Sequence, residues 1–480
     1  MRQDTVWQGE MEIREPVSVM GVTVRVAPGT TIRFKGQQGA ASPPAVFLNS
    51  TAGNEPRLML EGTADRPIIV ETPEDLPPGM ICTTRGSHGT LIAQHVVFRR
   101  LGGSTSGNAD ALDLQLSAVG NELRLIDCRF ENCGPVRMDF LGPTAAAEIK
   151  RCDFADTQGD TALLLGGSGS GEKTVTDNIA DAGFRLDCPD LLLRDNVLVG
   201  PAAAISVPTL TKEGIRLDRN YVHCTYKRDE GRYALKCDTP HAELTRNVLI
   251  GGTYVVAAAP RTVRDNVLIG VAGLEAKVVM QEIKIAVPKL EATTHALITG
   301  LANEASIQNN LLLGPTHAAL SISGPDKAPR IEHNLFDGWD AARRAVHFNL
   351  LARGAVGAEL KNNVFTRYQR APVFDQAGLQ GTMAEASDNL FAGFTGPIYE
   401  NIKGVDDLAS SDRRIETFGQ LRLAAPLTTQ AALDAEERLL RREIGVADVH
   451  ALWLAAYRPM DNSPLRGKKA SIGPSTGDSQ

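Results

Sequence analysis

Aromatic residues are scarce in this chain: phenylalanine, tryptophan and tyrosine make up 5% of its 480 residues. Hydrophobic residues nevertheless reach 42%, so the core has to be built mainly from leucine, valine, isoleucine and alanine. Grooves that bind sugars are usually lined with aromatic rings. The scarcity of rings therefore counts against an enzyme that acts on neutral polysaccharides.

Several signals that would define other classes of protein are missing. No apolar run reaches 18 residues, so no transmembrane helix is expected. The formal net charge is -7 and no long basic run is present, so nucleic acid is not an expected partner. The seven cysteines form no zinc-type CxxC pair, and their odd number argues against a disulfide framework. We expect them to be small buried residues, and Cys128 and Cys152 occupy matching positions in successive repeats.

The chain is rich in internal repetition. Eight segments share an Asn followed by an apolar run that often closes with Gly, and Asp127-Cys-Arg-Phe130 and Arg151-Cys-Asp-Phe154 are degenerate forms of the same phrase. Successive Asn residues are 24, 27, 19, 44, 24, 29 and 26 positions apart, and we interpret the step of 44 as two coils, one without the Asn. The repeated residues are Asn196, Asn220, Asn247, Asn266, Asn310, Asn334, Asn363 and Asn389.

Each Asn separates two short stretches that read as strands, such as Ala242-Glu-Leu-Thr245 and Val248-Leu-Ile250. One residue between them must bend the backbone, and Asn adopts the left-handed conformation more readily than any residue except Gly. Its amide can also bond to the same Asn in neighbouring coils. The repeat therefore predicts a parallel β-helix of about a dozen coils of roughly 24 residues. Helical repeats would need 3.6-residue periodicity, and the leucine-rich consensus is absent.

The stretches from Val17 to Phe34 and from Leu58 to Val70 resemble opening coils of the right-handed parallel β-helix superfamily, the pectate-lyase-like fold. Asp461-Asn-Ser-Pro-Leu465 is similar to its closing segment. The resemblance implies an all-β, single-stranded, right-handed parallel β-helix that binds its substrate along one sheet. The catalytic signatures of polygalacturonases and pectate lyases are missing, so no particular member is indicated.

We expect three regions in the chain. Residues 1–16 should cover the first coil, residues 17–425 should form the β-helix, and residues 426–480 should form a C-terminal capping segment. Within that segment, Thr428 to Arg442 reads as an amphipathic helix that Gly445 can end. We expect the helix to seal the C-terminal end of the solenoid.

One sheet of the predicted solenoid carries charges on its outward side. Asp113 and Asp139 are expected to be adjacent carboxylates about 4.8 Å apart. Carboxylates that close repel and raise one pKa unless Arg137 or a bound Ca²⁺ intervenes. Strand alternation places a column of six residues outward, with Arg137 and Arg185 beside it: Asp113, Asp139, Leu164, Asp187, Ser206 and Lys236.

Catalytic chemistry on this column could take two forms. Two carboxylates about 5 Å apart suit a retaining glycosidase. A lyase would instead use Lys236 or Arg185 as the base that removes a proton. The alternative is a solvated face of alternating charges. The catalytic candidates are Asp113, Asp139, Asp187, Lys236 and Arg185, and Asp113 and Asp139 are also the candidate Ca²⁺ ligands.

A second charged cluster is expected in a turn between coils. A basic turn with a histidine and a tyrosine could grip an acidic sugar, and loops carry function more often than strands do. A charged loop exposed to solvent is the alternative. Together with Arg137, the binding candidates are His223, Tyr226, Lys227, Arg228 and Arg232.

Two functional hypotheses follow from the sequence. The first is an extracellular or surface β-helix protein that binds a carbohydrate or a protein partner without strong catalysis. The alternative is a carbohydrate-active enzyme, a polysaccharide lyase or glycoside hydrolase, that acts on an acidic polysaccharide. Met1 is not followed by an apolar signal region, so an extracellular or periplasmic location is expected from the resemblance alone, and a cytoplasmic one stays open.

Overall fold

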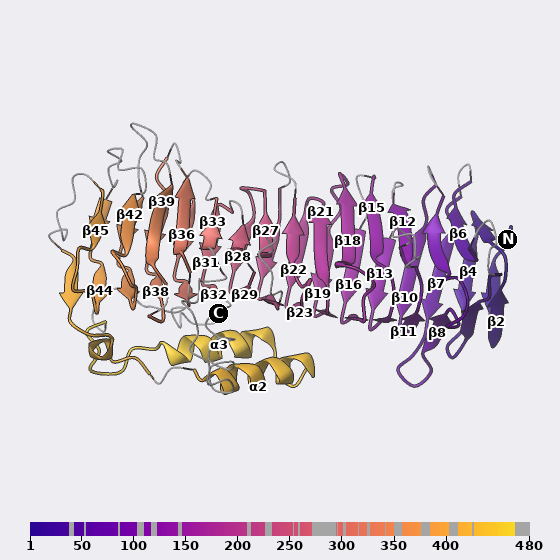
Figure 1. Cartoon of the computed structure of the whole chain (residues 1–480). Helices are drawn as coiled ribbons and strands as arrows, with labels where there is room; N and C mark the ends of the chain where they lie inside the picture. Colours follow the sequence, from indigo (N-terminus) through magenta and orange to yellow (C-terminus); the bar gives the residue numbers. More distant parts are fainter. Residues whose placement is uncertain are drawn as a thin grey trace. The chain divides into compact units, whose positions relative to one another are not determined.

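The computed structural model divides the chain into two compact units, Met1–Ile215 and Arg216–Gln480. In both units, short parallel strands stack coil upon coil into three sheets (Figure 1). The fold is therefore an all-β parallel β-helix with a short helical C-terminal segment, as the repeat predicted. The structure describes residues 1–37, 43–51, 54–84, 87–102, 110–116, 122–142, 146–208, 213–225, 233–252, 254–257, 260–270, 294, 296–300, 304–314, 316–323, 327–340, 342–349, 358–375, 385–402, 411–424 and 427–465.

The first unit contains three sheets, which we name A1, B1 and C1. Sheet A1 consists of β1 (Thr5–Trp7), β4 (Thr23–Val26), β7 (Arg57–Glu61), β10 (Thr90–Gln94), β13 (Glu122–Ile126), β16 (Ala146–Lys150), β19 (Lys173–Thr176) and β22 (Leu191–Arg194). Sheet B1 consists of β2 (Glu10–Ile13), β5 (Thr31–Phe34), β8 (Ile68–Glu71), β11 (Val96–Arg99), β14 (Arg129–Glu131), β17 (Asp153–Ala155), β20 (Ile179–Ala180) and β23 (Val197–Gly200). Sheet C1 consists of β3 (Val17–Met20), β6 (Ala45–Asn49), β9 (Met80–Thr83), β12 (Leu112–Leu116), β15 (Val136–Phe140), β18 (Thr161–Gly167), β21 (Gly183–Asp187) and β24 (Ile205–Val207).

The second unit contains sheets A2, B2 and C2 and the helices. Sheet A2 consists of β25 (Arg216–Asp218), β28 (Glu243–Thr245), β31 (Thr262–Arg264), β34 (Ser306–Gln308), β37 (Arg330–Glu332), β40 (Glu359–Lys361) and β43 (Glu385–Ser387). Sheet B2 consists of β26 (Tyr221–Cys224), β29 (Val248–Gly251), β32 (Val267–Ile269), β35 (Leu311–Leu313), β38 (Leu335–Asp337), β41 (Val364–Thr366), β44 (Leu390–Ala392) and β46 (Arg413–Ile415). Sheet C2 consists of β27 (Tyr233–Cys237), β30 (Tyr254–Ala257), β33 (Ala296–Thr299), β36 (Ala318–Ser323), β39 (Arg344–Asn349), β42 (Val373–Asp375) and β45 (Tyr399–Glu400). The helices are η1 (Phe418–Leu421), α2 (Thr429–Leu440) and α3 (Val446–Ala456).

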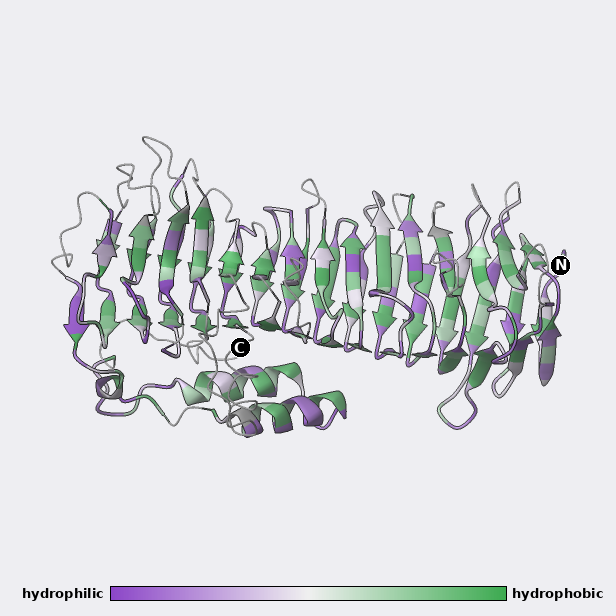
Figure 2. Cartoon of the chain, in the orientation of Figure 1, coloured by the Kyte–Doolittle hydropathy of each residue, from purple (hydrophilic) through white to green (hydrophobic). Residues whose placement is uncertain are grey.

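Equivalent residues of successive coils lie over one another, one strand apart. Inward positions are filled by buried aliphatic side chains and by stacked rings, so that each coil adds its own slice of core. Figure 2 shows hydrophobic residues recurring along the strands of successive coils. The rings of Phe98, Phe130 and Phe154 illustrate the stacking, with centroids 4.7 and 4.9 Å apart along the file. The solenoid already begins at Thr5 and Glu10, because β1 and β2 pair with the next coil inside the segment expected to be an N-terminal cap.

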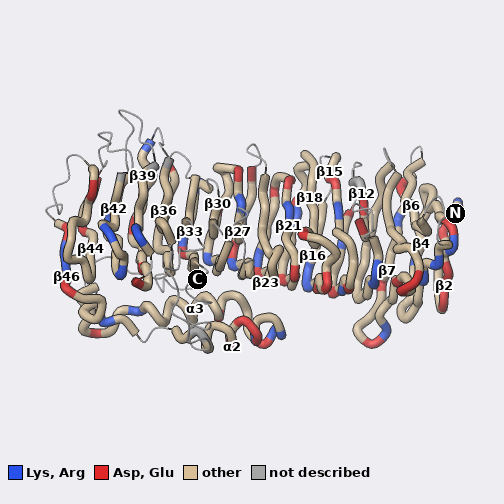
Figure 3. Tube along the Cα trace, in the orientation of Figure 1, with Lys and Arg blue, Asp and Glu red and all other residues tan. Residues whose placement is uncertain are grey.

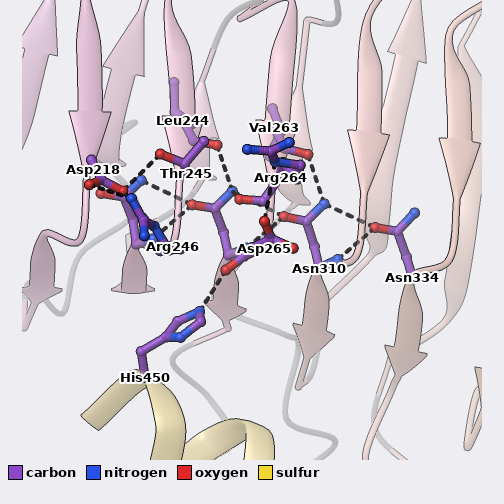
Figure 4. Close-up of polar contacts among 12 residues, drawn as sticks. Asp218, Leu244, Thr245, Arg246, Val263, Arg264, Asp265, Asn310, Asn334 and His450 are labelled. Carbon is purple, nitrogen blue, oxygen red and sulfur yellow. Dashed lines mark hydrogen bonds and ion pairs between the residues drawn. The ribbon is translucent and has the colours of Figure 1, made fainter. Parts of the chain in front are cut away.

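The repeated Asn residues form a buried ladder, as predicted (Figure 4). The side-chain oxygen of Asn310 accepts hydrogen bonds from the backbone N–H of Asn266 at 2.9 Å and from the Asn266 amide at 3.0 Å. The amide of Asn310 in turn donates to the carbonyl of Val263 and to the side-chain oxygen of Asn334, both at 2.9 Å. Each amide therefore ties three successive coils together.

The backbone bend does not fall on these Asn residues, which corrects the reason given for their presence. The left-handed residue is the one before each Asn: φ is 56° at Arg246, 59° at Asp265 and 58° at His333. Because the preceding residue makes the turn, the Asn itself is free to point its amide inward. The ladder, and not tolerance of positive φ, is what requires Asn at this position.

Cysteine occupies the ladder position in two earlier coils. The thiol of Cys152 donates to the carbonyl of Leu125 at 3.5 Å, as an Asn amide does, and its backbone N–H donates to the side chain of Asn178 at 2.8 Å. Asn178 is a ladder residue that the sequence repeat did not include. The seven cysteines are all buried and none forms a disulfide, as expected.

The step of 44 residues is one coil and not two. Strand β31 pairs directly with β34, and Asn266 bonds directly to Asn310. The extra residues therefore form an insertion between β32 and β33, and most of it lies outside the described residues. Counting periods alone could not separate a missing Asn from a long insertion.

The C-terminal helices α2 and α3, which we call the helical pair, lie beside sheet B2 (Figure 1). Helix α3 contacts β29, and Glu436 on α2 bonds to Tyr221 on β26, so the pair covers the side of the coils at these strands. In the described part of the chain, no helix is long and apolar enough to span a membrane.

Candidate functional site

The outward side of sheet C1 carries two rows of residues that cross four neighbouring strands, β12, β15, β18 and β21. Strand register places each residue directly beside the next one in its row. The first row reads Asp113, Arg137, Leu164 and Arg185. The second row reads Gln115, Asp139, Gly166 and Asp187 in the strand register. Figure 3 shows basic and acidic residues along the strands of this part of the chain.

This register corrects the column inferred from the sequence. In the strand register Asp113 lies opposite Arg137, and Asp139 is two residues further along β15. The carboxylates of Asp113 and Asp139 are therefore not directly opposite one another. Arg137 therefore lies beside Asp113, where a second carboxylate was expected. Asp187 shares a row with Asp139 but is two strands away, with Gly166 between them.

The four-residue centre of this face is Asp110, Asp113, Arg137 and Asp139, which we call the aspartate cluster. Atom Nη2 of Arg137 lies 3.4 Å from Asp139, and Nη1 lies 4.0 Å from Asp110. One guanidinium thus faces three carboxylates, which leaves the cluster with more negative than positive charge. Asp110 belongs to no strand, so strand alternation in the sequence could not assign it to this face.

Burial shifts the titration of two of these carboxyl groups. Burial and the nearby carboxylate of Asp113 raise the pKa of Asp110 to about 6, although Arg137 opposes the shift. Burial also raises the pKa of Asp113, with Arg137 opposing the shift and Asp139 adding to it. Asp110 therefore exchanges its proton near the pH at which a general acid works best.

Gly166 makes room for the carboxylate of Asp139. A Cβ atom at Gly166 would lie 2.8 Å from Oδ1 of Asp139, closer than side chains pack. The carboxylate of Asp139 therefore leans over Gly166 on the neighbouring strand. This tilt depends on the absence of a side chain at Gly166.

The remaining catalytic candidates are arranged differently. Arg185 is exposed in the first row of sheet C1, as expected. Lys236 lies on β27 of sheet C2, in the other unit, and its amine is 3.3 Å from Asp238. A base at Lys236 would therefore first have to leave this ion pair.

The second predicted cluster is only partly described. His223 lies in strand β26 and not in a turn, and its Nδ1 is 2.6 Å from Glu436 of helix α2. The expected turn is therefore wrong for His223, whose side chain contacts the helical pair, and its role in binding a sugar stays a prediction. The other members, Tyr226, Lys227, Arg228 and Arg232, lie outside the described residues.

A hollow of about 250 Å³ lies elsewhere, on the outward side of sheet A1. Within this hollow, Arg124 lies 2.6 Å from Glu122 and 3.4 Å from Glu148, so its guanidinium group is paired with two carboxylates. Among the described residues, no group of three or more His, Cys, Asp or Glu side chains is arranged to hold a metal ion. The proposed Ca²⁺ site at Asp113 and Asp139 would thus have to draw most of its ligands from outside these two side chains.

No protein-family model matches the sequence, and a comparison with curated proteins finds no similar chain. The geometry alone therefore defines the class of protein: a parallel β-helix solenoid with a charged outward face on sheet C1. Assignment to a particular superfamily stays a prediction.

Proposed function

We propose that the protein is a carbohydrate-binding β-helix and that the outward face of sheet C1 binds the glycan. The observation that carries the proposal is the pair of rows on β12, β15, β18 and β21, where one row holds Asp113, Arg137 and Arg185 and the neighbouring row holds Asp139 and Asp187. Carboxylates accept hydrogen bonds from sugar hydroxyls, and guanidinium groups donate to sugar oxygens. Strands about 4.8 Å apart repeat these groups along the solenoid, as an extended glycan repeats its hydroxyls.

The balance of charge favours one class of glycan. Asp110, Asp113, Asp139 and Asp187 outnumber Arg137 and Arg185 on this face. An excess of carboxylates repels a uronic-acid polymer and attracts sugars that donate hydrogen bonds or carry an amine. Neutral or amine-bearing glycans are therefore favoured over the acidic polysaccharide considered from the sequence.

Glycoside hydrolysis is a second candidate, favoured by the raised pKa of Asp110, about 6. A carboxyl that keeps its proton to this pH can protonate the leaving oxygen of a glycosidic bond. Asp139, which pairs with Arg137, would be the base that activates water. The extracellular or periplasmic location of such a protein also stays a proposal.

The test combines binding and turnover on one set of variants. Wild-type protein and the double variant Asp113→Asn/Asp139→Asn are compared on an array of neutral, amine-bearing and uronic-acid glycans, with and without Ca²⁺. The control is Glu61→Gln, a half-exposed outward residue of sheet A1. Binding that is lost in the double variant and kept in the control supports the proposal.

The proposal fails if the double variant binds glycans as the wild type does, or if the wild type binds none. Hydrolysis is checked separately by release of reducing ends from the glycans that bind, between pH 5 and 7. Release that disappears in Asp110→Asn supports the second candidate, whereas binding without release leaves the protein a binding module only.

A further inference from the structure

At the end of α3, Nε1 of Trp339 donates a hydrogen bond to the hydroxyl of Tyr457 at 2.9 Å. Two further polar contacts that hold the helical pair on the coils of the second unit involve a carboxylate and an imidazole. One contact is on α2 and involves Glu436, and the other is on α3 and involves His450. The two side chains are largely buried, so a change in the charge of either one is felt by the docked helix.

The α2 contact is built around an ionised carboxylate. Oxygen Oε2 of Glu436 accepts a hydrogen bond from the hydroxyl of Tyr221 at 2.6 Å and lies 2.6 Å from Nδ1 of His223. Burial alone would raise the pKa of Glu436, but the bonds from His223 and Tyr221 outweigh it and lower that pKa below its usual value of 4.5. The docked state therefore favours the charged form of Glu436.

The α3 contact is built around a neutral imidazole. Nε2 of His450 lies 2.6 Å from the backbone carbonyl of Asp265, which can only accept, so Nε2 carries the proton and donates it (Figure 4). Burial lowers the pKa of His450 below 6.5; the carbonyl and the carboxylates of Asp265 and Asp218 oppose this shift, and the charge of Arg246 adds to it. Arg264 lies beside the same group, 3.2 Å from Asp265.

We propose that the helical pair is an acid-sensitive clasp that opens in two stages, in which mild acid loosens α3 at His450 while Glu436 still holds α2 on sheet B2. The first stage uncovers part of β29, whose residues Val248, Leu249 and Ile250 are all buried. The clasp is independent of the glycan-binding face, which lies in the other unit.

The order of the two stages follows from the signs of the shifts. His450 has a lowered pKa when docked, so its contribution to docking is complete above pH 6.5 and is lost as the pH falls below that value. Glu436 also has a lowered pKa, so its contribution is complete above pH 4.5 and is lost only in stronger acid. Between these values α3 is weakened and α2 is not. At pH 5.5, one unit below the ordinary pKa of histidine, opening of α3 should increase by up to about tenfold.

Amide hydrogen exchange on the full chain tests the proposal. Peptides from α3 and from α2 are followed at pH 7.5 and 5.5, with rates corrected for the intrinsic effect of pH. We expect the corrected exchange of α3 to rise by up to about tenfold at pH 5.5 while that of α2 is unchanged. The variant His450→Gln keeps an N–H donor that cannot titrate, and it should abolish the difference. Asp434→Asn is the control, because Asp434 is an exposed residue of α2 whose contact is with Gln430.

Equal loss of protection in both helices at pH 5.5, or a pH effect that persists in His450→Gln, overturns the proposal. If His450→Gln releases α3 at both pH values, the titration of the wild-type His450 imidazole by NMR decides. A pKa below 6.5 supports the clasp, and a pKa at or above 6.5 overturns it.

Discussion

Replacing Asn310 by alanine should destabilise the second unit by about 3 kcal/mol. The substitution removes the oxygen that accepts from the backbone N–H of Asn266, a buried donor that would then lack its partner. A buried donor left unsatisfied costs about 1–3 kcal/mol. The lost bond from the Asn310 amide to Val263 adds about 1 kcal/mol. The amide of Asn266 itself loses less, because it also donates to Leu244 and Arg264.

Urea unfolding gives the total loss, and amide exchange shows where it falls. In a solenoid each coil contacts only its neighbours, so exchange should rise in β32, β35 and β38 more than elsewhere. The control is Gln308→Ala, which removes an outward side chain two residues away that bonds to Glu332. A loss below about 1 kcal/mol for Asn310→Ala, or one equal to that of the control, would refute the view that the ladder stabilises the coils.

Three further predictions follow from single contacts. Gly166→Ala should displace the carboxylate of Asp139 and weaken glycan binding several-fold with an unchanged circular dichroism spectrum, since a Cβ there lies 2.8 Å from Oδ1. Asp110 has a raised pKa, so its contribution to stability is present below pH 3.8 and is lost as the pH rises through about 6; Asp110→Asn should flatten this part of a melting-temperature profile. Asp337→Ala should cost about 3–5 kcal/mol in urea unfolding, because it leaves the guanidinium of Arg367 without the fully buried carboxylate that it bonds to; a loss close to zero would contradict the role of this pair.

The repeat of the solenoid could be predicted because the ladder requires the same residue, Asn, at the same position of successive coils. An Asn at this position bonds to the coils on both sides, so Asn247 and Asn266 are visible in the sequence although the coil between them has only 19 residues. The backbone conformation was less visible. Asp or Asn, which adopt the left-handed conformation more readily than most residues, precede the ladder Asn in five of the eight repeats, and Arg or His precede it in the others. The sequence therefore held a partial signal for the bend, but the invariant Asn beside it drew the assignment.

For the candidate site, the sequence predicted which residues lie on the face but not how they are paired across the strands. The sequence placed Asp113, Arg137 and Asp139 on the outward side of neighbouring strands, and the structure agrees. The register between those strands depends on the lengths of the turns that join the three sheets. These lengths vary from coil to coil. Alternation therefore predicts which face of the sheet a residue lies on, but not which residue of the next strand lies beside it. A shift of two residues keeps every side chain on the same face and still places Arg137, and not Asp139, beside Asp113.

A difference in burial between strands of sheets B1 and B2 indicates that sheet B2 is covered by another element. In B1, strand Arg129–Glu131 alternates between charged and buried residues, and its outward side is exposed to solvent. In B2, all four residues of β29 are buried, although one side of the strand faces away from the core. Strands that are apolar on both sides are covered on both sides. The run Val248-Leu-Ile250 therefore contained the information that something covers sheet B2. No local pattern in α2 or α3 names that sheet, because burial of an amphipathic helix requires only an apolar face and not a particular one.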